Sequence, residues 1–164
     1  MRTMFLENEK LIFMDDDDFQ KLSQYHWWTN KKGYAVRQVR EDGKLKNIFM
    51  HRIIMEAKKG EIVDHINGNR IDNRRCNLRM VTPNQNCWNL RPKRKGTSIY
   101  KGVSKMKYLT RVTRQPKEKW RASIEENGRH HSLGLHDTEK DAALAYNEAA
   151  KKYHGEYAVL NEVS

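Results

Sequence analysis

The alternation of apolar and polar residues predicts a small antiparallel region near the start of the chain. The run "KLIFM", residues 10–14, is apolar enough for a short strand, and "DFQKLSQY", residues 18–25, is predicted as a short helix. Residues 34–39 alternate in polarity, and the Asp-Gly pair at 42–43 should turn the chain into a second strand over 44–51.

The central segment predicts a strand, a loop, a strand and a helix in that order. A short helix over 51–57 precedes this segment, the two strands are expected over 61–67 and 77–82, and the second helix should run to about Trp88. Thr82 is expected to cap this second helix, with Pro83 at its first position, because Pro lacks the N–H that would be unpaired there.

The last third of the chain predicts three strands followed by one helix. The strands are expected near 100–105, 119–125 and 129–135, with "ENG" turning the second into the third. Thr138 begins the helix in a variant capping box with Asp141, and Gly155 ends it. One apolar stripe should face the sheet: Ala142, Tyr146, Ala149 and Tyr153.

Charge and composition bear on the partner and on the division of the chain. The 164 residues carry 32 Lys and Arg against 21 Asp and Glu, a net charge of +11. This predicts a polyanionic partner, either nucleic acid or an anionic membrane surface, although a basic chain can also be merely soluble. Residues 91–136 hold 13 of the cations and 3 of the acids. The run "RPKRKG" at 91–96 is predicted as a linker between domains at 1–90 and 97–164.

No segment predicts a membrane span or a secretion signal. No apolar run approaches the roughly 18 residues that a span needs, and the first residues lack a signal-peptide core. Cys76 and Cys87 stand alone, which fits a reducing compartment and provides no zinc framework. We therefore expect a cytoplasmic protein, in a bacterial or phage-infected cell. The acidic run Asp15–Asp18 is expected to cap a helix starting near Phe19, with metal binding as the alternative.

Chemistry-bearing residues gather around "VDHINGN", residues 63–69. Asp64 offers a carboxylate oxygen and Asn86 an amide oxygen, which together could hold one hard cation; Mg²⁺ accepts few protein oxygens, and Mn²⁺ fits the same set. His65 can take a proton from an attacking water. The alternative is an ordinary hairpin with an Asn-rich loop. Because adjacent strand residues point to opposite faces, Asp64 and His65 can serve one phosphate only where the strand ends, twists or bulges.

The stretch "DHINGNRIDNRRCNLRMVTPNQN", with "MHRIIMEA" before it, resembles the HNH nucleases of phages and intron homing endonucleases. The resemblance covers about residues 50–90. It implies that Asp64 and Asn86 are metal ligands, that His65 is the general base, and that Asn77 braces the loop through backbone hydrogen bonds. His51 is left open between a structural and an assisting role. Four arginines could contact phosphates or be solvated: Arg70, Arg74, Arg75 and Arg79.

Residues 97–162 resemble the Apetala/ethylene-response-factor DNA-binding domain. The resemblance is carried by "YKGVS", "KWRASI", "LGLHDTEKDAALAYNEAA" and "GEYAVLN". It implies a three-stranded sheet that enters the major groove, with one helix behind it. An insertion, "KYLTRVTRQPKE", and changed residues on the reading face mean that the plant target sequence does not carry over. The candidate DNA contacts are Lys101, Lys105, Arg111, Arg114, Arg121 and Arg129.

Together these features predict an α+β protein of two domains. The first is a ββα-metal (HNH) nuclease domain preceded by a small antiparallel region, and the second is a three-stranded antiparallel sheet packed on one helix. The expected activity is that of a homing-type DNA endonuclease, which uses Mg²⁺ or Mn²⁺ and nicks one strand of duplex DNA as a monomer. No obligate protein partner is expected, and a dimer stays possible. The rivals are a non-cleaving DNA-binding regulator with a decayed nuclease domain and an RNA-binding protein.

Overall fold

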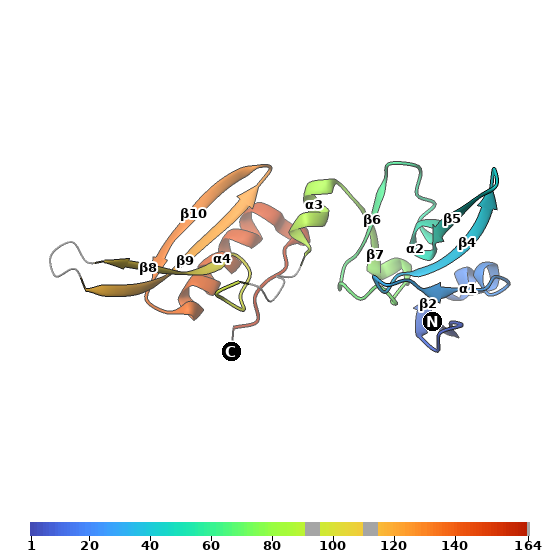
Figure 1. Cartoon of the computed structure of the whole chain (residues 1–164), viewed down its shortest axis with the longest axis horizontal. Coiled ribbons are helices and arrows are strands. Elements are labelled where there is room, and N and C mark those ends of the chain that lie inside the picture. The colour runs from blue at the N-terminus through green and yellow to red at the C-terminus, as the bar shows by residue number, and fades with distance from the viewer. Residues whose placement is uncertain (91–95, 110–114, 164) are drawn as a thin grey trace. The chain divides into compact units, whose positions relative to one another are not determined.

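The computed structural model describes residues 1–90, 96–109 and 115–163, and the chain divides into two compact units. The first unit is Met1–Asn86 and the second is Cys87–Ser164 (Figure 1). Their boundary falls inside one helix, slightly before the expected end of the first domain at residue 90. Of the predicted linker over 91–96, only Gly96 lies among the described residues. In the part of the chain that is described, no helix has the length and apolar character needed to cross a bilayer.

The first unit is built from small antiparallel sheets and short helices. β1 pairs with β2, β3–β4–β5 form a three-stranded sheet, and β6 pairs with β7. The elements are, in chain order, β1 (Arg2–Phe5), β2 (Leu11–Met14), α1 (Asp16–Leu22), β3 (Trp28–Thr29), β4 (Ala35–Glu41), β5 (Lys44–Phe49), α2 (Met50–Ile54), β6 (Ile62–His65), η1 (Arg75–Asn77), β7 (Leu78–Val81) and α3 (Pro83–Trp88).

The predicted hairpin after residue 34 is confirmed. β4 and β5 pair from Val36 opposite Phe49 to Glu41 opposite Lys44. Asp42 and Gly43 connect the strands with φ of 51° and 73°, the positive values that a tight two-residue hairpin turn requires. In Figure 1 the hairpin runs directly into α2, so α2 starts at a place that the turn has fixed.

One apolar cluster joins these sheets and helices into a single core. Trp27 is 2% exposed, and its indole N–H donates to the carbonyl of Leu22 at 2.9 Å, which satisfies the one polar group that the ring buries. Its other large, fully buried side chains come from β2 and α2, and they are Ile12, Met14, Met50 and Ile54.

The loop between β6 and β7 is tied to this core through the backbone of β2. The N–H of Phe13 donates to the carbonyl of Ile71 at 2.9 Å, and the carbonyl of Phe13 accepts from the N–H of Asn73 at 2.8 Å. Since β2 packs in the core, these two bonds fix the position of the loop relative to the core.

The acidic run plays a different part from the one expected. α1 begins at Asp16, not near Phe19, and Asp15 at its N-cap position makes no side-chain cap bond. Asp15 Oδ2 instead accepts from the backbone N–H of Arg75 at 2.8 Å, and the buried Asp18 carboxylate accepts two hydrogen bonds from the Arg75 side chain at 2.8 and 2.9 Å. The run therefore holds α1 against the β6–β7 loop.

The second unit is a three-stranded antiparallel sheet, ordered β10–β9–β8, against which one helix packs. Its elements are β8 (Val103–Leu109), β9 (Pro116–Glu126), β10 (Arg129–His136), α4 (Glu139–His154) and η2 (Gly155–Tyr157). Thr138 caps α4 as predicted, and its side chain accepts from the N–H of Asp141 at 3.1 Å.

Small residues allow α4 to lie close to the sheet. Ala142 and Ala150 are fully buried on the helix, and Tyr146 is 2% exposed between them. Gly102 has a φ of +72°, and a Cβ atom there would come 2.0 Å from the Tyr146 ring. Tyr146 therefore occupies the space that any other side chain at position 102 would need.

Loss of the Arg75 side chain should destabilise the first unit. Arg75→Ala leaves the Asp18 carboxylate, 4% exposed, without its charged partner. We expect the free energy of unfolding to fall by about 1.5–3 kcal/mol in urea denaturation. Lys46→Ala removes an exposed pair with Glu41 and should leave the free energy of unfolding nearly unchanged. Equal effects of the two substitutions would contradict this role of Arg75.

Candidate functional site

Asn77 closes the loop between β6 and β7. Its side-chain Oδ1 accepts from the backbone N–H of Asn67 at 3.0 Å, and its Nδ2 donates to the carbonyl of Asp72 at 2.8 Å. Asn77 is 6% exposed, so both bonds are sheltered from water. They are the kind of backbone contacts that bracing of the loop requires.

A buried carboxylate that the sequence analysis did not single out completes this loop. The Asp72 side chain is 5% exposed and accepts from Arg74 Nε at 2.7 Å and Nη2 at 2.6 Å, in a two-pronged pair. It also accepts from the side chain of Asn67 at 3.1 Å. The hydrogen bond and charge of Arg74 hold the pKa of Asp72 below its ordinary value. The "DNR" stretch in the loop was the only available signal, because the sequence does not show which arginine pairs with which acid.

His65 is the last residue of β6, and its side chain is buried. The residue is 3% exposed, and its Nε2 lies 3.3 Å from Oδ1 of Asn73, which is fully buried. Burial lowers the pKa of His65, while the hydrogen bond with Asn73 and the charge of Asp64 act in the opposite direction. The ring is therefore neutral at pH 7, the form that can accept a proton.

A cluster of rings surrounds His65. The His51 ring on α2 lies 5.1 Å from it, edge to face, and Tyr34 lies 5.9 Å away. Phe49 completes the cluster at 5.6 Å from His51. Burial, followed by the charge of His65, lowers the pKa of His51 to about 3. Nδ1 of His51 has no hydrogen-bond partner among the described residues, so protonating it would place a charge where nothing described compensates it.

The side chains of Asp64 and His65 lie on opposite faces of the β6–β7 hairpin. They are consecutive in a regular ladder, with Asp64 opposite Arg79 and His65 opposite Leu78. Asp64 Oδ2 lies 3.3 Å from Nη2 and 3.4 Å from Nε of Arg79, and both side chains are nearly buried, at 12% and 13% exposed. The strand ends at His65, where the N–H of Gly68 returns to the carbonyl of His65 at 2.9 Å. The turn thus begins directly after the two residues.

Asn86 lies on α3, whose start is well defined. The side chain of Thr82 accepts from the N–H of Gln85 at 3.3 Å, and the Gln85 side chain accepts from the N–H of Thr82 at 2.8 Å. This is a reciprocal capping box, so the predicted cap is confirmed. The N–H of Asn86 donates to the carbonyl of Thr82 at 3.0 Å, and the Asn86 side chain is half-buried.

The donor chemistry fits a metal ion that keeps much of its water. In the described part of the chain, no three His, Cys, Asp or Glu side chains gather as a metal site. Asp64 and Asn86 offer one carboxylate and one amide oxygen, and Mg²⁺ binds to few protein oxygens while retaining waters or phosphate oxygens. The nearly buried Asp64 already has a cationic neighbour in Arg79.

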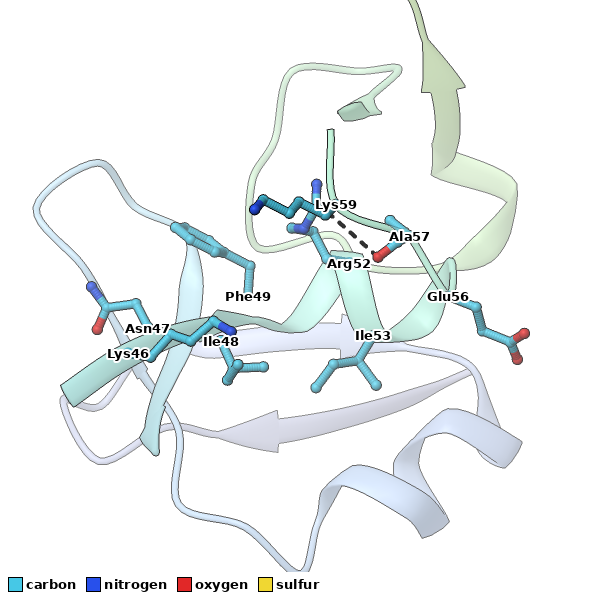
Figure 2. Close-up of a pocket in the computed structure, with 9 residues that line it drawn as sticks. All are labelled: Lys46, Asn47, Ile48, Phe49, Arg52, Ile53, Glu56, Ala57 and Lys59. Carbon is cyan, nitrogen blue, oxygen red and sulfur yellow. Dashed lines mark hydrogen bonds between the residues drawn. The ribbon is translucent and has the colours of Figure 1, made fainter. Parts of the chain in front are cut away.

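A pocket of about 670 Å³ lies beside β5 and α2, apart from the predicted catalytic residues (Figure 2). Arg52 lines it and donates to the carbonyls of Ala57 at 3.4 Å and Lys58 at 2.8 Å, and it also reaches the carbonyl of Glu61. These bonds tie the chain that leads into β6 back to α2. Arg52 therefore helps to position the strand that carries Asp64 and His65.

The predicted DNA contacts of the second unit do not share one face of its sheet. Ala122 and Ile124 of β9 are buried under α4, so Arg121 lies on the opposite, uncovered face. Lys105 pairs with Glu118 at 2.5 Å and lies over the Trp120 ring. Arg129 is exposed at the start of β10. Of the other three predicted contacts, Arg111 and Arg114 lie outside the described residues, which leaves Lys101.

Lys101 is turned into the second unit. Its ammonium group donates to the carbonyl of Trp88, and burial lowers its pKa to about 8. The Trp88 ring stacks on His154 with centroids 4.5 Å apart and planes 9° apart. Trp88 is itself a residue of the second unit and is packed within it, with Lys101 half-buried beside it.

Residues 49–87 match the family described as HNH endonuclease. This segment contains His51, Asp64, His65, Asn77 and Asn86. The chain is similar to an uncharacterized HNH endonuclease, L560, of Acanthamoeba polyphaga mimivirus, with 32% identity over 154 residues that cover 92% of this chain and 74% of the relative. It is also similar to Protein 3.8 of Escherichia phage T7, with 31% identity over 100 residues, 61% of this chain and 75% of the relative. No solved structure matches.

The burial of His51 should make the stability of the fold depend on pH. Unfolded His titrates near 6.5 and folded His51 near 3, so between these values the unfolded state binds more protons and stability falls as pH falls. We expect His51→Phe to make the stability loss between about pH 6 and about pH 4.5 shallower, by up to about 1.4 kcal/mol per pH unit in urea denaturation. Phe49→Leu, in the same ring cluster, removes no titratable group and should keep the wild-type slope. Identical slopes for His51→Phe and wild type would contradict a neutral buried His51.

Proposed function

We propose that this chain, which belongs to the HNH endonuclease family, is a homing-type DNA endonuclease that cuts one strand with one divalent metal ion and His65 as general base. Family membership itself makes the chain a nuclease with DNA as its substrate, and HNH nucleases generally use a divalent metal. The observation that carries the finer proposal is His65, which is buried, neutral, and next to Asp64 at the start of a loop braced by Asn77.

The proposed step is hydrolysis of a phosphodiester bond. The oxygen of a water molecule attacks phosphorus, its proton passes to the neutral His65 ring, and the bond from phosphorus to the 3′ oxygen breaks. The hydrogen bond with Asn73 and the contact with the His51 ring hold His65 in place for this transfer. Asn77 acts indirectly, because it fixes the backbone of the turn that follows His65.

Asp64 and Asn86 are the residues that would hold the metal ion. When bound, such an ion supplies positive charge that stabilises the leaving oxygen. Mg²⁺ is our first candidate and Mn²⁺ the second, because both prefer oxygen ligands. Arg79 Nη2, 3.3 Å from Asp64 Oδ2, helps to orient that carboxylate.

One catalytic site accounts for one cut strand, so we propose that a monomer nicks duplex DNA. Cutting both strands would need two copies or two successive events. The alternative is a regulator that binds DNA without cutting it. The joint presence of Asp64, His65, Asn77 and Asn86 favours the nuclease, since a chain that had lost the activity would have no chemical reason to retain all four.

We also propose that the second unit binds duplex DNA as an Apetala-like domain and positions the nuclease unit. The uncovered face of its sheet carries Arg121, and the separate basic residues Lys105 and Arg129 lie on the neighbouring strands. Such a division of labour is chemically sensible, because contacts at the cut phosphate carry no sequence information whereas contacts to base edges do.

Removal of the His65 ring should stop cleavage without stopping binding. We expect His65→Ala to lower the nicking rate on supercoiled plasmid with Mg²⁺ by about 10²–10⁴-fold, the usual contribution of a general base. Binding of DNA in EDTA should change little. His26→Ala, an exposed histidine of the same unit, is the matched control and should nick at the wild-type rate. Undiminished nicking by pure His65→Ala protein would exclude the general-base role.

Binding of DNA by the second unit should depend strongly on salt. We expect residues 87–164 alone to bind duplex DNA, with the logarithm of the association constant falling by about 0.9 per neutralised phosphate for each unit in the logarithm of salt concentration. Arg121→Gln should make this slope shallower by about 0.9 if Arg121 contacts one phosphate. Fluorescence anisotropy across a salt series measures both values, and a flat response would argue against a DNA-binding sheet.

A further inference from the structure

Three of the four arginines around the β6–β7 loop already have a carboxylate partner. Arg74 is paired with Asp72, Arg75 with Asp18 and Arg79 with Asp64. The three carboxylates are 4–12% exposed, so each of these guanidinium groups compensates a buried or nearly buried charge. Moving Arg74 or Arg75 to a phosphate would leave a buried carboxylate uncompensated, and Arg79 is engaged by the carboxylate that we propose as a metal ligand.

Arg70 differs from the other three. It is exposed, and among the residues that the structure describes it forms no ion pair with any Asp or Glu. Its Nη1 donates to the carbonyl of Lys32 at 2.6 Å, and its Cζ lies 4.7 Å from the centre of the Tyr34 ring. The guanidinium group is therefore held in place by neutral groups, with its charge uncompensated and with N–H donors left to bind another ligand.

Tyr34 places this charge next to His65. The same ring that lies under Arg70 is 5.9 Å from the His65 ring and 5.2 Å from His51. One turn separates His65 from Arg70 in the sequence. Hydrogen bonds of the Asn77 and Asn67 side chains fix the backbone of that turn. Arg70 and His65 thus both contact one aromatic ring, and hydrogen bonds brace the turn between them.

We infer that Arg70 binds the phosphate that is cut, and so forms an anionic-oxygen site beside His65. The inference rests on the proposed function, because it assigns this phosphate to the step in which His65 takes the proton. The guanidinium group of Arg70 is a planar fork that can donate two parallel hydrogen bonds to two oxygens of one phosphate. A charge held in place before the substrate arrives stabilises negative charge on those oxygens with little reorganisation. Lys32 beside it is a flexible point charge and provides no such fork.

The test compares Arg70→Gln and Arg70→Lys with Arg40→Gln in the full-length protein. Arg40 is an exposed arginine of β4, next to the Asp42–Gly43 turn, so its substitution removes the same charge from the same unit. Thermal unfolding of each variant, which should lie close to wild type because Arg70 is exposed, shows that the variants fold.

Nicking of supercoiled plasmid with Mg²⁺ and saturating protein is the first readout. Loss of one pre-positioned donor should lower the rate constant about 10²–10³-fold in Arg70→Gln. Arg70→Lys should recover part of the loss, since it restores the charge without the fork, and Arg40→Gln should stay within about twofold of wild type. Wild-type nicking by Arg70→Gln, alongside an inactive His65→Ala protein, would overturn the assignment of Arg70 and leave the proposed function standing.

The salt dependence of DNA binding in EDTA is the second readout, and it requires no cleavage. Arg70→Gln should make the log–log slope shallower by about 0.9, the value for one phosphate contact, and Arg40→Gln should not. An unchanged slope in Arg70→Gln would overturn the inference. A wild-type protein that binds DNA without nicking would instead refute the proposed function, and the slope would still decide whether Arg70 contacts a phosphate.

Discussion

The position of His65 depends on a loop that is held together by hydrogen bonds among its own polar groups. Asn77 bridges the backbone of Asn67 and the carbonyl of Asp72, and Asp72 in turn holds Arg74 and the Asn67 side chain. An unpaired buried polar group costs about 1–3 kcal/mol, so each member of this set makes the others necessary. Apolar packing alone would not fix the conformation of such a loop, because apolar contacts are not directional. Hydrogen bonds are directional, and these bonds place the turn directly after His65.

Ion pairing then separates the four arginines around the β6–β7 loop by role. Arg74 and Arg75 compensate buried carboxylates, and Arg79 lies beside Asp64. Arg70 is held by a ring and a carbonyl, and we assign its charge to an external anion. Both histidines of the ring cluster are buried, and burial lowers the pKa of each, to about 3 for His51. They differ in position, because His51 lies within α2 whereas His65 ends β6, directly before the turn. Position in the fold, rather than burial, is therefore what assigns the proton transfer to His65.

Local sequence rules predicted the elements well where short-range chemistry determines them. The Asp42–Gly43 turn, the Thr82 cap with Pro83 behind it, and the Thr138 cap all depend on residues within four positions of one another. β1 and β3 were not predicted, because β1 depends on pairing with β2 and β3 has only two residues held by β4. The acidic run was assigned to a local cap because its partner, Arg75, lies almost sixty residues further along the chain.

The same limit applies to the candidate site. The pattern of Asp64, His65, Asn77 and Asn86 could be found in the sequence through its spacing, and family membership accounts for that spacing. Other features could not be found in this way: the pairing of Asp72 with Arg74, the contact of His51 with His65, and the absence of an acidic partner for Arg70 among the described residues. Each depends on which side chains the fold brings together. Such pairings have no fixed sequence interval, so only the three-dimensional structure reveals them.

The central claim is that this chain cuts DNA in a reaction that needs a divalent metal ion, and one measurement tests it directly. Purified wild-type protein is incubated with supercoiled plasmid carrying a library of target sequences, in parallel with Mg²⁺ and with EDTA, and the nicked ends are sequenced. We expect open circular DNA with Mg²⁺ only, with one strand cut at a recurrent site. Equal nicking in EDTA, or binding without any nicking in Mg²⁺ or Mn²⁺, would contradict it.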